Sequence, residues 1–233
     1  MNYYIDTEFL EGTQTNGQPW FNFWLGPKAK EKPTIDLISI GIAAEDGREY
    51  YAISKDFNLK EAWNRYDWYS TAYNKPARNK EEQDFKVYWI RENVLKPIFD
   101  QWNKYSYHTF NFSNFKYCID CIGKTNQQIA EEVKEFTLEV PRIQKHGKPK
   151  FYGYYCDYDW VAFCWLFGKM IDLPNGFPMY CRDLKQMLDE AFLLRSDYQK
   201  PEHHPNYPKQ TNEHNALADA RWNKKLHEFI KTL

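Results

Sequence analysis

The sequence has no excess of charge of either sign. Its 31 Lys and Arg residues nearly balance its 32 Asp and Glu residues, which leaves a formal net charge of −1. This balance excludes the broad basic surface that drives non-specific binding to polyanions. A polyanionic ligand would therefore need local help, such as a bound metal ion.

Long apolar runs are also missing, and the N-terminus has acids where a signal peptide has a basic and then an apolar stretch. The cysteines are few: five, at irregular spacing, which fits free thiols in a reducing compartment. We therefore expect a cytoplasmic protein without a membrane partner. Cys118 and Cys121 form a single CxxC motif without a second pair, so its spacing disfavours a zinc site completed by His108 and His146.

Aromatic residues, by contrast, are abundant. They make up 18% of the chain, as 9 Trp, 18 Tyr and 16 Phe residues. Such a content suits either a dense core or a surface that stacks nucleobases, and it does not choose between them. The length of 233 residues is enough for a full core. We expect a single domain, residues 1–233, with insertions at about residues 10–33 and 105–123.

The periodicity of apolar residues predicts an α/β fold. Alternating patterns predict three strands in an antiparallel meander, and two strand-and-helix units follow later in the chain. The strands are expected near residues 1–9, 35–44, 49–54, 150–156 and 179–181. The helices are expected near residues 59–66, 80–102, 126–138, 157–170, 182–194 and at the end of the chain. These elements predict a mixed five-stranded sheet, three antiparallel strands and then two parallel ones, flanked by helices.

The first strand carries two acids on one face. Asp6 and Glu8 are two residues apart, so their side chains leave the strand on the same side, roughly 6.5–7 Å apart. Two carboxylates this close repel each other unless one is protonated or a cation lies between them. On its own, such a pair is more often the polar face of an edge strand. Acidic residues elsewhere in the chain are therefore needed to distinguish a metal site from a polar edge strand.

Two later helices place an Asp on an apolar stripe. Asp159 lies in line with the apolar residues of the helix after residue 156, and Asp219 lies in line with those of the last helix. Asp157 is expected to cap the first of these helices. Asn215 is expected to cap the last one, which places His214 just before its first turn. Each Asp alone also fits an N-terminal acid favoured by the helix dipole.

These segments together resemble the three motifs of the DEDDh (DnaQ-like) 3′-5′ exonucleases, which have an RNase H-like fold. The likeness extends to the RNase AS group of small bacterial exoribonucleases, which prefer polyadenylate. The motifs are Asp6-Thr7-Glu8, Tyr154-Tyr155-Cys156-Asp157-Tyr158-Asp159 and His214-Asn215-Ala216-Leu217-Ala218-Asp219. Two departures are Tyr155, where the family usually has Asn, and the two expected insertions.

The resemblance implies a metal-dependent 3′-5′ exoribonuclease that releases nucleoside 5′-monophosphates from single-stranded RNA 3′ ends. It implies two Mg²⁺ or Mn²⁺ ions held by Asp6, Glu8, Asp159 and Asp219, with His214 as the general base. An imidazole suits that role because it titrates near neutral pH.

Several points stay open at the level of sequence. Phe9 and Leu10 directly follow Glu8 and are candidates to stack or wedge the terminal base. The family also tends to dimerise. Nothing in the sequence fixes recognition of the 2′-hydroxyl, so a DNA 3′-5′ exonuclease is an alternative. A further alternative is a nucleic-acid-binding module that kept the fold and lost catalysis.

Overall fold

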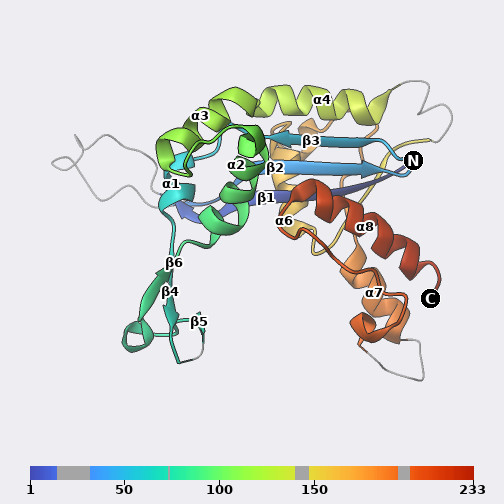
Figure 1. Cartoon of the computed structure of the whole chain (residues 1–233). Helices are drawn as coiled ribbons and strands as arrows, with labels where there is room; N and C mark the ends of the chain where they lie inside the picture. The colour runs from blue at the N-terminus through green and yellow to red at the C-terminus, as the bar shows by residue number, and fades with distance from the viewer. Residues whose placement is uncertain (15–31, 73, 140–146, 194–199) are drawn as a thin grey trace. The chain divides into compact units, whose positions relative to one another are not determined.

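The computed structural model describes residues 1–14, 32–72, 74–139, 147–193 and 200–233. Its main sheet has five strands in the order β3-β2-β1-β7-β8 (Figure 1). The strands are β1 Asn2–Gln14, β2 Lys32–Ala44, β3 Glu49–Ile53, β7 Lys150–Gly153 and β8 Arg182–Asp183. The first strand of the sequence therefore lies at the centre of the sheet.

The strand directions make this sheet mixed. β2 and β3 pair antiparallel, with Ile40 opposite Ala52. β1 and β7 pair parallel, with Tyr3 opposite Phe151, and β7 pairs parallel with β8. The arrows of β1 and β2 point in opposite directions in Figure 1. The predicted α/β class and mixed five-stranded sheet flanked by helices are confirmed, and the architecture is consistent with an RNase H-like fold.

One face of the sheet is covered by the last two helices, α7 (Leu184–Leu193) and α8 (Ala216–Ile230). Tyr4 of β1 belongs to the buried cluster that these helices form with the sheet. Because side chains alternate along a strand, Asp6 and Glu8 leave β1 on the same face as Tyr4.

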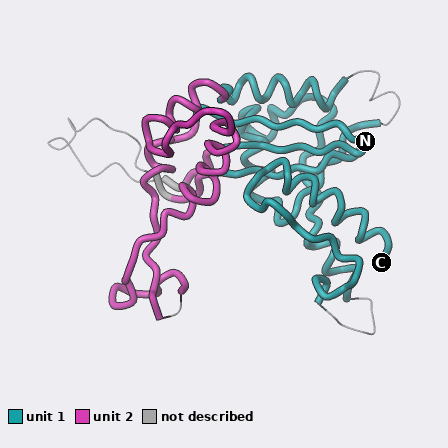
Figure 2. The backbone as a smooth tube through the Cα atoms, viewed as in Figure 1, with its two compact units in different colours: residues 1–9, 37–56, 123–233 teal, residues 10–36, 57–122 magenta. Residues whose placement is uncertain are grey.

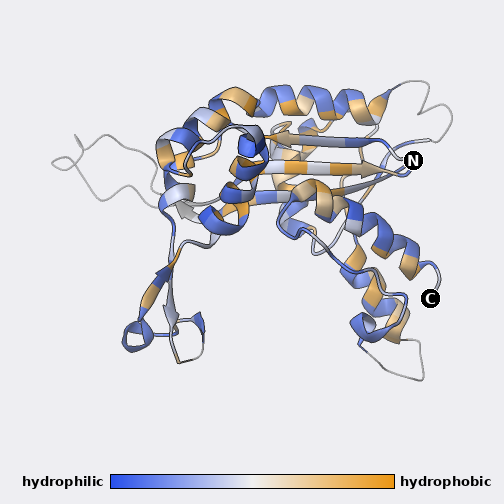
Figure 3. Cartoon of the chain, viewed as in Figure 1, coloured by the Kyte–Doolittle hydropathy of each residue, from blue (hydrophilic) through white to orange (hydrophobic). Residues whose placement is uncertain are grey.

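The opposite face is covered by α4 (Asn126–Leu138) and α6 (Asp157–Trp165). Tyr3 donates its hydroxyl to a backbone carbonyl of α4 over 3.2 Å. Phe151, which lies beside Tyr3 in the sheet, packs its ring against Phe163 of α6 with centroids 5.0 Å apart. Figure 3 shows apolar residues recurring among polar ones along α4, as an amphipathic helix on a sheet requires.

A histidine of α8, His227, faces the core between this helix and the sheet. His227 is 3% exposed, and its Nδ1 lies 2.9 Å from the hydroxyl of Tyr4. Its ring stacks on Tyr152, with the centroids 4.3 Å apart. Burial lowers the pKa of His227 to about 4, so the imidazole is neutral at physiological pH.

The chain divides into two compact units (Figure 2). The first contains residues 1–9, 37–56 and 123–233, and the second contains residues 10–36 and 57–122. The main elements of the second unit are α1 Leu59–Asn64, β4 Asp67–Ser70, β5 Lys75–Pro76, β6 Phe85–Val87, α2 Lys96–Trp102 and α3 Phe112–Ile122. Its strands form a separate sheet in the order β5-β4-β6.

The second unit has an aromatic core of its own. The ring of Trp63 contacts those of Phe110, Phe112 and Phe115, at centroid distances of 4.9, 5.7 and 5.8 Å. Part of the high aromatic content therefore packs the interior of this unit. Such contacts stabilise a small core beyond the area that they bury.

Some expected elements differ from the structure. The helix expected over residues 80–102 is wrong in its first part: Phe85, Lys86 and Val87 form β6, because this segment pairs antiparallel with β4 and its aromatic and β-branched residues favour a strand. The expected insertion at 105–123 includes the helix α3. The expected insertion at 10–33 falls mostly on residues 15–31, which lie outside the described residues. Within the described ranges, no helix combines the length and apolarity that crossing a bilayer requires.

Candidate metal centre

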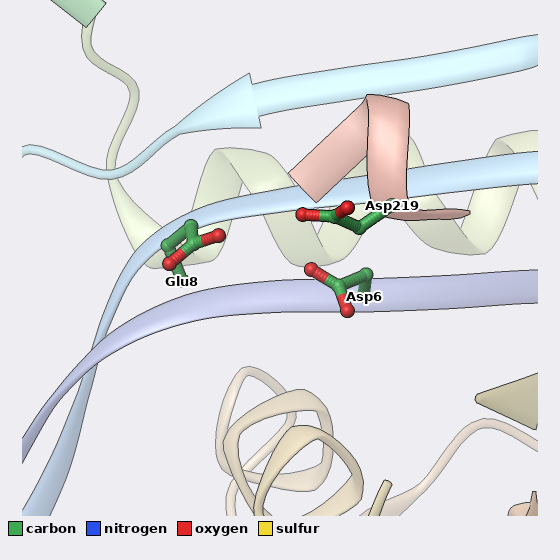
Figure 4. Close-up of side chains that lie close together, drawn as sticks. All are labelled: Asp6, Glu8 and Asp219. Atoms are coloured by element: carbon green, nitrogen blue, oxygen red, sulfur yellow. The ribbon is translucent and has the colours of Figure 1, made fainter. Parts of the chain in front are cut away.

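Three carboxylates meet at the centre of the main sheet. Asp6 and Glu8 come from β1, and Asp219 comes from the first turn of α8 (Figure 4). One oxygen from each carboxylate lies within 4.8 Å of the other two. Among the residues that the structure describes, no other group of three His, Cys, Asp or Glu side chains comes this close.

The electrostatics of this cluster are unfavourable without a counter-charge. Burial, and then the charges of Asp159, Glu8 and Asp219, raise the pKa of Asp6 well above its usual range. Burial and the charges of Asp219 and Asp159 raise the pKa of Glu8 to about 8. Burial likewise raises the pKa of Asp219. The group therefore holds protons, or needs cations, near neutral pH.

Asp159 approaches β1 from the other side of the sheet. It lies in the first turn of α6 and is 7% exposed. Its Oδ1 accepts hydrogen bonds from the backbone N–H of Thr7 at 2.8 Å and from the hydroxyl of Thr7 at 2.6 Å. Burial raises the pKa of Asp159 to about 6, while the bonds from Thr7 oppose that rise. Asp159 is thus near enough to act on Asp6 electrostatically and is anchored between the two strand acids.

The position of α8 is fixed by contacts close to the cluster. The side chain of Asn215 caps the helix by accepting from the N–H of Ala218 at 3.0 Å, as the sequence predicts. One turn after Asp219, the buried side chain of Asn223 donates to the carbonyl of Ile5 over 2.9 Å. This bond joins α8 to the residue that precedes Asp6.

Gly41 of β2 lets the start of α8 come close to the sheet. A Cβ atom at this position would lie 2.2 Å from the carbonyl oxygen of Ala216, which is a backbone atom and cannot move aside alone. A glycine is therefore required where β2 meets the first turn of α8. That turn carries Asp219.

Asp219 is held by two donors from the segment before α8. The side-chain amide of Gln210 donates to its Oδ1 over 2.6 Å, and the backbone N–H of His214 donates to its Oδ2 over 2.9 Å. His214 has a positive φ of 65°, which turns the chain into the helix. It stands just before the helix, as the sequence predicts, and it is half-buried.

The aromatic residues next to the acids also meet. Phe9 follows Glu8, Tyr158 precedes Asp159, and their ring centroids lie 6.0 Å apart. Tyr158 is 50% exposed and Phe9 is half-buried. Leu10 is fully buried, so in this structure it offers no surface to a substrate.

The N-cap of α6 and the CxxC motif of α3 both lie outside the carboxylate cluster. Cys156, not Asp157, is the N-cap of α6, and Asp157 is its exposed first residue. The expected cap is therefore wrong, because the helix begins one residue earlier. In α3, Cys118 is buried and Cys121 is exposed, and neither belongs to a group of three metal-binding side chains among the described residues. His146 lies outside those residues.

The sequence did not reveal Thr7, Gln210 or Asn223 as parts of the site. Thr7 lies inside the first motif, but only the fold shows that it binds Asp159. Gln210 and Asn223 carry no motif at all, and they join the site through contacts 9 and 218 residues apart in the chain. No local pattern in the sequence encodes such pairings.

The donor set fits a divalent cation. Carboxylate oxygens are the ligands that Mg²⁺ and Mn²⁺ prefer, and a cation would relieve the repulsion that raises the pKa values here. The fold and the site together define an α/β protein of RNase H-like architecture with a candidate metal centre on its central strand.

Two proteins of Mycobacterium tuberculosis, from two strains and both named 3′-5′ exoribonuclease, are similar to this chain. Each is 28% identical to it over 221 residues, which cover 95% of this chain and 88% of the relative. No protein-family model matches the chain. The similarity therefore runs through both compact units.

Proposed function

We propose that the protein is a metal-dependent 3′-5′ exoribonuclease that releases nucleoside 5′-monophosphates from the 3′ ends of single-stranded RNA. The observation that carries this proposal is the convergence of Asp6 and Glu8 of the central strand with Asp219 of α8, whose ligand oxygens lie within 4.8 Å of one another. Two relatives named 3′-5′ exoribonuclease, at 28% identity over nearly the whole chain, support the same activity.

The metal ligands in this proposal are the four carboxylates. Asp6, Glu8 and Asp219 would hold one Mg²⁺ or Mn²⁺ ion, and Asp6 would hold a second with Asp159 nearby. When bound, such a pair neutralises the phosphodiester charge and stabilises the attacking and leaving oxygens of an in-line displacement. The raised pKa values of Asp6, Glu8 and Asp219 support this assignment, because a cation would favour their charged forms.

The chain's own groups supply the remaining roles. His214 is the general base that takes a proton from the attacking water. Its backbone N–H holds Asp219, so the base and this metal ligand are coupled through one short segment. Phe9 and Tyr158 flank the acids and stack the terminal base, a role that their ring contact and the exposure of Tyr158 support.

The substrate preference in this proposal is polyadenylate, as in the RNase AS group. Five sequence segments support that narrower likeness: Tyr4-Ile5-Asp6-Thr7-Glu8-Phe9, Leu37-Ile38-Ser39-Ile40-Gly41, Asp46-Gly47-Arg48-Glu49-Tyr50-Tyr51, Phe177-Pro178-Met179-Tyr180 and Ala216-Leu217-Ala218-Asp219-Ala220-Arg221. A homodimer, which the same likeness implies, is checked by the mass of the protein in solution.

The test is degradation of labelled single strands. RNA and DNA tails of each base are incubated with the protein in Mg²⁺, Mn²⁺ or EDTA, beside the Asp6→Asn variant. We expect shortening from the 3′ end that needs metal, is faster on RNA than on DNA and fastest on adenylate, and is lost in the variant.

Other outcomes separate the alternatives. Faster shortening of DNA identifies a DNA exonuclease. Binding of RNA without any shortening identifies a catalytically silent module. Full activity in EDTA or in Asp6→Asn would refute the metal-dependent mechanism.

A further inference from the structure

The small sheet of the second unit has no core of its own. Its strands β4, β5 and β6 contain between two and four residues each. Among the described residues from 66 to 88, only Ser70 is buried. A short sheet that buries neither face fully is marginally stable in water. Tyr66 is exposed and Trp68 and Tyr88 are half-buried, so part of each ring is available to a ligand. The catalytic site proposed above uses none of them.

Aromatic rings lie close together on one face of this sheet, next to the ammonium group of Lys86. Trp68 of β4 lies opposite Lys86 of β6. Tyr66 contacts Trp68, with centroids 5.9 Å apart, and Tyr88, with centroids 5.8 Å apart. The ammonium of Lys86 lies 3.9 Å from the ring centroid of Tyr66 and 5.3 Å from that of Trp68. We call Tyr66, Trp68, Lys86 and Tyr88 the aromatic face.

Lys86 has no anionic partner among the residues that the structure describes. It is exposed, and it makes no hydrogen bond or ion pair with any residue that the structure describes. Arg91 differs, because its Nε donates to the carbonyl of Trp63 over 2.7 Å while its guanidinium lies 3.9 Å from the centroid of Tyr88. Arg91 therefore fixes the position of Tyr88, and Lys86 is the cation that is left for an anion.

Two acids of this region, Glu61 and Asp67, lie beside Tyr66. A hollow of about 420 Å³ next to Tyr66 is lined by Glu61, Asn64, Arg65, Tyr66 and Asp67. Glu61 is paired with Arg65 at 3.0 Å. The charges of Glu61 and Arg65 offset each other, so Asp67 leaves the hollow with a negative charge. Phosphate is therefore favoured over Lys86 and not in the hollow, which sets the side on which a nucleic-acid backbone would lie.

We propose that the aromatic face binds single-stranded RNA, with bases stacked on Tyr66, Trp68 and Tyr88 and a backbone phosphate on Lys86. Rings that accept any base, together with an unpaired cation, are how proteins hold single strands without reading their sequence. The choice of RNA rests on the proposed function, and the aromatic face adds a binding site for the body of the substrate.

The experiment measures binding and cleavage separately. Binding of fluorescent 20-nucleotide oligoadenylate to the full chain is measured in EDTA, so that it does not depend on catalysis. We expect Lys86→Glu and Tyr66→Leu each to weaken this binding roughly ten-fold. Tyr66→Phe keeps the ring and should bind like the parent protein. Lys134→Glu, on the exposed side of α4, is the control for the same change of charge.

Cleavage assays then show whether a substitution acts at the aromatic face or at the catalytic site. A dinucleotide fills only the catalytic site, so its hydrolysis in Mn²⁺ should be unchanged in Lys86→Glu, whereas the KM for the 20-nucleotide strand should rise. Binding in EDTA with no hydrolysis would sink the proposed function and leave this proposal standing. Unchanged binding in both Lys86→Glu and Tyr66→Leu overturns it. A dimer that Lys86→Glu splits, without loss of RNA binding, overturns it too and identifies the face as a protein interface.

Discussion

Thr7 donates two hydrogen bonds to the same oxygen of Asp159, one from its backbone and one from its hydroxyl. Thr7, the middle residue of the first motif, therefore binds Asp159 on α6, while Asp6 and Glu8 point to α8. Through Thr7, the central strand connects carboxylates on both faces of the sheet. This arrangement explains how Asp159 can act on Asp6 although α6 and α8 cover opposite faces.

Thr7→Val should remove one of these bonds at nearly constant shape. Thr7 is 5% exposed, and a hydrogen bond to a charged group is worth about 1.5–3 kcal/mol. The pKa of Asp159 is raised to about 6, so the bond to the ionised form matters above that pH. We expect metal-free Thr7→Val to lose about 2 kcal/mol of unfolding free energy at pH 8 and less at pH 5. Urea unfolding at both pH values measures this. Thr7→Ser keeps the hydroxyl and is the control; an equal loss at both pH values would contradict the assignment.

The stability of the metal-free protein should fall as the pH rises. Glu8 has a pKa raised from its ordinary 4.5 to about 8, so the folded state holds a proton that the unfolded state releases. The resulting stability is full below pH 4.5 and is lost as the pH passes 8, by up to about 1.4 kcal/mol per pH unit. In EDTA, Glu8→Gln should flatten this slope. Glu135→Gln, on the exposed side of α4, should leave the slope unchanged. A slope that is the same with and without Glu8 would count against the cluster.

Substitutions of His214 and Asp219 should separate a loss of catalysis from a loss of metal binding. His214→Asn tolerates the positive φ at this position and keeps the backbone N–H that holds Asp219. We expect it to lower kcat by about 10²–10⁴ while Mn²⁺ still raises the melting temperature. Asp219→Asn should lose both effects. Thermal unfolding with and without Mn²⁺, beside single-turnover cleavage, distinguishes the two. If His214→Asn loses the thermal shift as well, His214 is a ligand or a structural residue and not the base.

Gly41→Ala should abolish activity although residue 41 carries no functional group. The new Cβ would meet the backbone of Ala216, and the first turn of α8 would have to move away from the sheet. We expect a loss of about 3 kcal/mol in unfolding free energy together with loss of cleavage. Gly47→Ala is the matched change, because a Cβ there meets nothing within 4 Å. Its φ of 89° costs about 1 kcal/mol in strain, but activity should remain. Active Gly41→Ala protein would show that α8 tolerates the shift.

The sequence predicts those features that depend on neighbours along the chain. The alternation of Tyr3, Ile5 and Thr7 places β1, and the Asn215 cap places the start of α8. The apolar stripe of the last helix predicts that Asp219 faces inward, and Asp219 is indeed only 6% exposed. Each of these signals is contained within about one strand or a few turns of helix.

Features made by distant parts of the chain escaped prediction. The strands β5 and β8 contain two residues each, too few to show a period, and β8 begins just after the strand expected at 179–181. The sequence also has no pattern for the bond from Gln210 to Asp219 or for the close approach of Gly41 to Ala216. Both depend on where the sheet places α8.

The buried imidazole of His227 offers an internal reference for titrations. Its pKa of about 4 keeps it neutral over the range in which an exposed histidine gains its charge. In a magnetic-resonance titration its ring signals should stay still from pH 8 to pH 5 as long as Tyr4 and Tyr152 enclose it. Movement of those signals would report loosening of the core under α8. The same spectrum can thus follow the packing of the helix that carries Asp219 without a label on the candidate metal centre.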